Sequence, residues 1–142
     1  MLQALREFAD QGVDYVLIGA AALGVHGIVR ATEDLDIFIR ATVENVLRLQ
    51  AAFRAVYGLD PNIDQIQAGD LLGDYPAIRY YPPSGDLYFD VMTRLGTAAD
   101  YDSVEAEIKD VAGVPVRVAS PRALYRLKRD TLRAIDHIED ET

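Results

Sequence analysis

The segment Asp-Leu-Asp-Ile-Phe-Ile at 34–39 is the feature that most constrains how this chain folds. Acidic or aromatic side chains alternate there with aliphatic ones, which predicts a β-strand with two unlike faces. The aliphatic residues Leu35, Ile37 and Ile39 would enter the core, and Asp34 and Asp36 would share the opposite face. Side chains two apart on a strand are about 6.5 Å apart, so the two carboxylates repel each other unless a cation lies between them. A solvated strand edge is the simpler alternative for this pair.

Asp90 interrupts an otherwise apolar strand expected over 87–92. Burying a lone carboxylate is costly, so Asp90 needs a partner. A divalent cation shared with Asp34 and Asp36 would provide one, because hard ions such as magnesium prefer oxygen ligands. A hydrogen-bonded edge-strand acid is the alternative. Asp86 would lie on the same strand face and is the competing candidate.

Gly19 follows a short apolar strand expected at 15–18 and opens an Ala-rich helical segment, 20–26. A glycine between a strand and a helix start lets backbone N–H groups approach a phosphate, although small residues also occur there for packing alone. The glycine-rich fingerprints of dinucleotide and P-loop sites are absent from the sequence. His26 is expected to pack or to form a hydrogen bond rather than to act in catalysis.

The chain has 142 residues, half of them hydrophobic, which suits one domain with its own core. Residues 59–75 fit a loop or a short helix equally well. Helices are expected at 2–11, 20–26, 42–58 (with Thr42 as N-cap) and from Ser120-Pro121 to near the end. Strands are expected at 15–18, 34–39, 77–81, 87–92, 107–111 and 114–118. This irregular mixture predicts an α+β (mixed α/β) fold.

Composition and charge narrow the chemistry. The absence of cysteine excludes disulfides, thiolate zinc sites and a cysteine nucleophile. The apolar runs are too short to span a bilayer and the start lacks a signal-peptide pattern, so we expect a cytoplasmic protein without a membrane partner. Residues 117–133 carry six cations and one acid, a net +5, within a chain of net charge −9. That stretch would be either a solvated helix face or a surface for phosphates.

Together these residues resemble the polymerase-beta-like nucleotidyltransferase superfamily. Its signature is a hydrophobic strand, Gly-[Gly/Ser], a gap, Asp-x-Asp on the next strand and a third acid on a later strand. Here Val16-Leu17-Ile18-Gly19-Ala20 is followed, after thirteen residues, by Asp34-Leu35-Asp36, with Asp90 as the third acid. Residues 27–34 and 115–136 also look like the small bacterial branch related to abortive-infection nucleotidyltransferase toxins. The resemblance spans about 13–140.

The resemblance implies a mixed sheet with flanking helices in a single domain, 1–142, with a catalytic core at about 13–95 and a C-terminal helical segment at about 120–142. It also implies a metal-dependent nucleotidyltransferase that moves a nucleoside monophosphate from a nucleoside triphosphate (NTP) to a hydroxyl. Asp34, Asp36 and Asp90 would bind Mg²⁺ or Mn²⁺, and Asp90 would accept the proton of the attacking hydroxyl.

The same resemblance assigns the triphosphate to Gly19, Ala20, Thr32 and Lys128. Arg30, Arg133 and Asp136 match the subfamily pattern, but could equally serve in ion pairs or caps. Ala20 stands where the family has Gly or Ser, so it keeps a backbone N–H but offers no hydroxyl. The acceptor is open between tRNA, protein and a small molecule, and a toxin role would add a cognate antitoxin as partner.

Three other classes of protein fit less well. Haloacid-dehalogenase-like phosphatases need an apolar strand before Asp-x-Asp, whereas Arg30-Ala31-Thr32-Glu33 precedes it here. Metal-dependent glycosyltransferases would leave Gly19 unexplained. A non-catalytic binding or regulatory module that keeps the fold is favoured by Ala20 and by an ending at Thr142, where such proteins often continue into further helix; the three acids argue against it.

Overall fold

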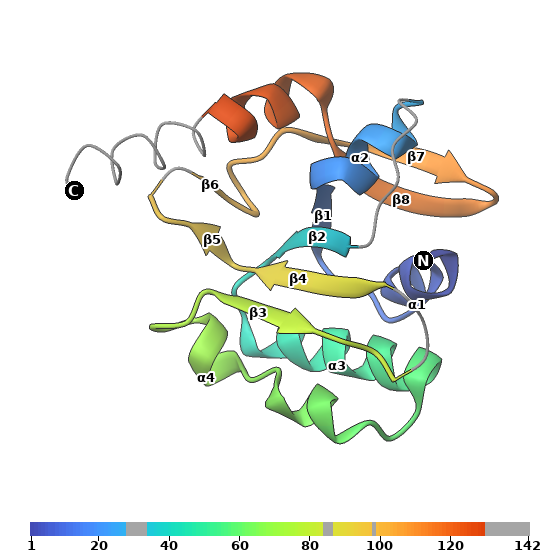
Figure 1. Cartoon of the computed structure of the whole chain (residues 1–142), viewed down its shortest axis with the longest axis vertical. Coiled ribbons are helices and arrows are strands. Elements are labelled where there is room, and N and C mark those ends of the chain that lie inside the picture. Colours follow the sequence, from blue (N-terminus) through green and yellow to red (C-terminus); the bar gives the residue numbers. More distant parts are fainter. Residues whose placement is uncertain (28–33, 84–86, 98, 130–142) are drawn as a thin grey trace.

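The computed structural model describes residues 1–27, 34–83, 87–97 and 99–129. Within them, six strands form one mixed sheet in the order β3-β4-β2-β1-β8-β7 (Figure 1). The strands of this sheet are β1 (Tyr15–Ile18), β2 (Asp34–Ile39), β3 (Ala77–Tyr80), β4 (Tyr88–Met92), β7 (Ala106–Val111) and β8 (Val114–Ala119). A separate pair of two-residue strands consists of β5 (Arg94–Leu95) and β6 (Ala99–Asp100).

The helices flank this sheet, so the expected α+β fold is confirmed. They are α1 (Leu2–Asp10), α2 (Gly19–Val25), α3 (Val43–Tyr57), the 3-10 helix η1 (Pro61–Gln65), α4 (Ala68–Leu71) and the helical residues 121–129. The undecided stretch 59–75 thus contains η1 and α4. The described residues contain no helix long and apolar enough to cross a membrane.

The two faces of the sheet are covered by different elements. Phe8 of α1 and Phe53 of α3 pack against one face, where Leu35, Ile37 and Ile39 of β2 are completely buried as expected. The opposite face carries Phe38, which packs in a second cluster with residues of helix 121–129. Asp34 and Asp36 share this second face by strand alternation. The alternation of β2 therefore supplies a buried aliphatic side and a carboxylate side.

Asn45 fixes the end of β2 against the start of α3. Its side chain is buried, and its Oδ1 accepts a hydrogen bond from the Asp14 N–H at 2.7 Å. Its Nδ2 donates to the carbonyl oxygens of Asp14 at 2.9 Å and Arg40 at 3.0 Å. The predicted N-cap is confirmed, since Thr42 Oγ1 accepts from the Asn45 N–H. These bonds fix the chain just before β1 and just after β2, the antiparallel pair that leads to the carboxylates.

Candidate metal centre

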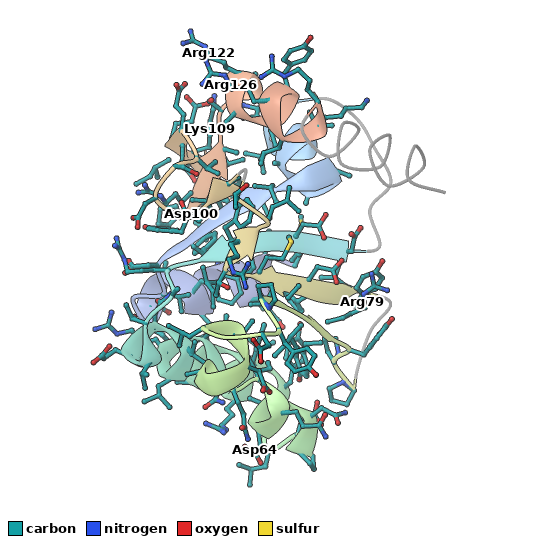
Figure 2. All side chains as sticks on the ribbon, turned by 90° about the vertical axis from the view of Figure 1, so that its left-hand side faces the viewer. Asp64, Arg79, Asp100, Lys109, Arg122 and Arg126 are labelled. Atoms are coloured by element: carbon teal, nitrogen blue, oxygen red, sulfur yellow. The ribbon has the colours of Figure 1, made fainter. Side chains whose placement is uncertain are left out.

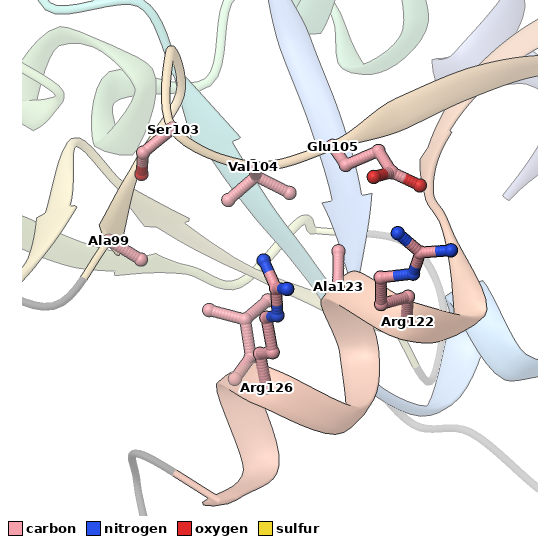
Figure 3. A pocket seen from close by; sticks show the side chains of 8 residues that line it. Ala99, Ser103, Val104, Glu105, Arg122, Ala123 and Arg126 are labelled. Carbon is pink, nitrogen blue, oxygen red and sulfur yellow. The ribbon is translucent and has the colours of Figure 1, made fainter.

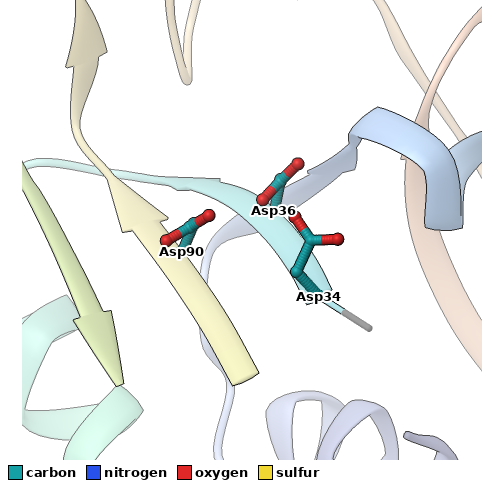
Figure 4. Close-up of side chains that lie close together, drawn as sticks. All are labelled: Asp34, Asp36 and Asp90. Atoms are coloured by element: carbon teal, nitrogen blue, oxygen red, sulfur yellow. The ribbon is translucent and has the colours of Figure 1, made fainter. Parts of the chain in front are cut away.

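Parallel pairing of β2 with β4 brings the three predicted acids together. In this ladder Asp36 is opposite Asp90 and Asp34 is opposite Tyr88. One carboxylate oxygen of each aspartate lies within 4.8 Å of those of the other two (Figure 4). All three side chains are half-buried. A cation shared by the three aspartates, as expected from the sequence, requires their carboxylates to converge, and the structure brings them together on neighbouring strands.

Asp36 has the least favourable electrostatic position in the cluster. Burial, followed by its interactions with Asp34 and Asp90, raises the pKa of Asp36 to about 8. Each cause disfavours the ionised form, because the neighbours are acids and solvent access is limited. Neutralisation requires either a proton or a cation. Three clustered carboxylate oxygens are a suitable donor set for Mg²⁺ or Mn²⁺.

Gly19 lies directly against this carboxylate. A Cβ added at Gly19 would be 2.5 Å from Asp36 Oδ2, and the φ of Gly19 is +72°. A side chain at this position would therefore be strained in its backbone and would force the Asp36 carboxylate to shift. The sequence placed Gly19 near phosphate; the structure gives it a further role in leaving room for Asp36. Ala20 follows in the first turn of α2, where backbone N–H groups lack intrahelical partners.

Arg79 of β3 is the cation that the sequence reasoning missed. Its Nε donates to Asp90 Oδ1 at 2.8 Å and its Nη2 donates to Asp90 Oδ2 at 3.4 Å. The antiparallel register of β3 with β4 places the two residues opposite each other. The strands expected at 77–81 and 87–92 leave the register between them open, so the sequence alone did not predict this pair. Asp90 therefore has a protein partner as well as its acidic neighbours.

Most of the other residues singled out in the sequence cannot be placed relative to the aspartates, because they lie outside the described residues. These residues are Thr32, Arg30, Asp86, Arg133 and Asp136. Lys128 is exposed on helix 121–129, and its role at a phosphate stays a prediction. His26 forms the expected hydrogen bond, with Nε2 at 2.9 Å from the Ala119 carbonyl oxygen.

Helix 121–129, which carries most of the positive charge of the 117–133 segment, borders a cavity separate from the carboxylate cluster. Arg122 and Arg126 line a cavity of about 160 Å³ together with Ser103 and Glu105 (Figure 3). None of the three aspartates is among its lining residues. Arg122 and Arg126 also lie well apart from Arg79 in Figure 2. These two arginines therefore do not contribute directly to the carboxylate cluster.

The fold is a mixed sheet with flanking helices that carries an acidic cluster on β2 and β4. No protein-family model matches the sequence, and no curated protein matches it. The fold is similar to the crystal structure of a proposed nucleotidyltransferase from Thermotoga maritima, TM1012, with a TM-score of 0.58. The likeness covers 98% of this chain and 88% of that chain at 12% sequence identity. At this identity the similarity shows the fold alone.

Proposed function

We propose that this chain is a metal-dependent nucleotidyltransferase that transfers a nucleoside monophosphate from an NTP to a hydroxyl acceptor. The observation that carries the proposal is the convergence of Asp34, Asp36 and Asp90 within 4.8 Å beside Gly19. The nucleotidyltransferase-like fold supports it. A cluster of three acids with one raised pKa is typical of a functional site rather than of a solvated edge.

Each part of the site has a proposed task. The three aspartates would bind Mg²⁺ or Mn²⁺, which supplies charge neutralisation and Lewis-acid activation of phosphate oxygens when bound. A carboxylate oxygen of Asp90 would accept the proton of the attacking hydroxyl. A new bond would then form between the oxygen of that hydroxyl and the α-phosphorus of the NTP, while the bond between the α-phosphorus and the pyrophosphate leaving group breaks. Gly19 and Ala20 would offer backbone N–H groups to the triphosphate, with Thr32 and Lys128 as further contacts.

The acceptor and the biological role are finer parts of the proposal. A tRNA acceptor is supported by the net charge of +5 over residues 117–133, since RNA binding requires cations opposite phosphates. A toxin acting with a cognate antitoxin is supported by the resemblance of residues 27–34 and 115–136 to the abortive-infection branch. Expression of the wild-type chain, but not of Asp36→Asn, would then arrest growth.

The test of the reaction is labelling with each α-³²P-NTP. The protein is incubated with one NTP, Mg²⁺ or Mn²⁺, and total cellular RNA and protein, and the labelled product is identified. We expect labelled acceptor with wild-type protein and none with Asp36→Asn. Magnesium-dependent NTP binding without any labelled product would instead support the non-catalytic binding module. Absence of both binding and labelling would contradict the proposed function.

A further inference from the structure

Arg79 forms hydrogen bonds with both carboxylate oxygens of Asp90, one of the three aspartates proposed to bind the metal. The distances to Asp90 are 2.8 and 3.4 Å, the two-pronged arrangement in which a guanidinium binds a carboxylate most strongly. The Asp90 side chain is 24% exposed and that of Arg79 is 49% exposed, so solvent screens the pair only in part. A divalent ion bound at Asp90 would lie next to this guanidinium, and like charges repel. The Arg79 guanidinium and a metal ion would therefore compete for the Asp90 carboxylate.

The other contacts of the Arg79 side chain are weak and lie at the surface, so Arg79 can move away from Asp90. Its Nη1 donates to the Tyr81 hydroxyl at 3.3 Å, and its Cζ lies 4.5 Å from the centre of the Tyr88 ring. The Arg79 side chain is 49% exposed and comes from β3, an edge strand of the sheet. It can therefore swing toward a ligand without opening the core. The centroids of the Tyr81 and Tyr88 rings are 5.3 Å apart, so the two aromatic side chains that contact Arg79 also pack against each other.

A triphosphate is the kind of ligand that would draw Arg79 away. The planar fork of a guanidinium fits phosphate oxygens as well as it fits a carboxylate. A nucleotide at the cluster places its phosphates beside the metal, and Asp90 is part of that cluster. The guanidinium would exchange one anionic partner for another within the same small region.

We infer that Arg79 is an exchange residue that couples metal binding to triphosphate binding. Before nucleotide binds, Arg79 is paired with Asp90 and weakens the metal site. When metal and triphosphate bind together, Asp90 turns to the metal and Arg79 pairs with the phosphates. Each ligand then raises the affinity for the other, and this coupling is reciprocal. The inference rests on the proposed function, because it requires both a metal at the aspartates and a triphosphate beside it.

The test compares two affinities in Arg79→Gln and in wild-type protein. The first is for Mn²⁺ alone, measured by the electron paramagnetic resonance signal of free Mn²⁺. The second is for inorganic tripolyphosphate in excess Mn²⁺, measured by calorimetry. We expect Arg79→Gln to bind Mn²⁺ alone about fivefold or more tightly, and tripolyphosphate about fivefold or more weakly, than wild-type protein. Arg79→Lys keeps the charge without the fork and should fall between the two.

Arg40→Gln is the matched control. Arg40 forms an ion pair with Asp14 at 3.0 Å and lies 4.7 Å from the centre of the Tyr101 ring, so its surroundings are similar and the charge removed is the same. We expect both of its affinities to stay within about twofold of wild type, since a distant exposed charge is screened.

The outcomes separate the inference from the proposed function. Opposite shifts of the two affinities in Arg79→Gln support the exchange. If both affinities rise, Arg79 only repels the metal; if both fall, Arg79 only supports the structure; either result overturns the exchange and leaves the metal site standing. If neither wild-type protein nor Arg79→Gln binds Mn²⁺, the proposed function fails and the exchange fails with it.

Discussion

The raised pKa of Asp36 shows that its ionised form is unfavourable in the folded protein when no cation is bound. Its folded-state pKa is about 8 against an ordinary value of 3.8, so between these limits the folded chain binds a proton that the unfolded chain has released. The stability from this proton is fully present below about pH 3.8 and is lost as the pH rises to about 8. At pH 7 the metal-free folded site therefore holds a proton on Asp36, and a metal that binds the three carboxylates would displace it.

The first prediction is that Asp36→Asn stabilises the metal-free protein in a pH-dependent way. In buffer with a chelator, the variant and wild type should have similar unfolding free energies near pH 4. At pH 9 the variant should be more stable by about 1.4 kcal/mol or more, the equivalent of one pKa unit. Urea titrations at both pH values measure this difference. Asp102→Asn, at a side chain that is 73% exposed, should show no such pH dependence; lower stability of Asp36→Asn at both pH values would indicate a structural role for Asp36.

The second prediction concerns the clearance beside Asp36. Gly19→Ala places a Cβ 2.5 Å from Asp36 Oδ2 at a φ of +72°, so we expect a loss of about 2 kcal/mol or more and weaker Mn²⁺ binding. Gly24→Ala is the control, because it lies in the same helix α2 with no atom within 4 Å of the added Cβ. That substitution should be neutral or stabilising by up to about 1 kcal/mol. Equal effects of the two substitutions in thermal unfolding would contradict this account of Gly19.

At the scale of elements, the sequence predicted individual strands but not the register in which they pair. Strands were expected at 107–111 and 114–118, on either side of Ala112-Gly113, and the structure has them as the paired strands β7 and β8. The β2 strand and its N-terminal acids were predictable from alternation alone. The pairing of Arg79 with Asp90 depends on register, and a slip of one residue moves a side chain to the other face. The two-residue strands β5 and β6 are too short to leave a periodic signal.

The third prediction tests the junction that positions β2. Asn45→Ala removes three hydrogen bonds to backbone groups of Asp14 and Arg40 in a buried position. Leaving such groups without partners should lower the unfolding free energy by about 2–4 kcal/mol. Thr42→Ala removes a single capping bond at the same helix and should cost about 1 kcal/mol. Urea titrations measure both; a smaller effect at Asn45 than at Thr42 would show that the junction is held by other contacts.

At the scale of the whole molecule, charge is divided between two regions. The segment 117–133 carries +5, and the remainder of the chain carries −14. The carboxylate cluster belongs to the acidic part, whereas Arg122 and Arg126 line a separate cavity with Ser103 and Glu105. A metal at the aspartates and a nucleic-acid contact at Arg122 and Arg126 would therefore involve different residues. Substitution of these two arginines should leave metal binding at the aspartates unchanged.

The last prediction applies this separation to the acceptor. If the acceptor is RNA, Arg122→Gln with Arg126→Gln should reduce RNA labelling and lower the slope of log affinity against log salt by about 1.4–1.8, the amount expected for two phosphate contacts. Mn²⁺ binding should not change, because neither arginine lines the carboxylate cluster. The control is Arg54→Gln with Lys109→Gln, which removes the same charge from α3 and β7. It should leave the slope as in wild-type protein, since these two side chains are already in ion pairs with Asp64 and Glu107. Unchanged labelling and slope in the Arg122 and Arg126 variant would mean that this face of helix 121–129 is a solvated surface that does not bind RNA. The acceptor would then be sought among proteins or small hydroxyl compounds, whose binding does not require these arginines.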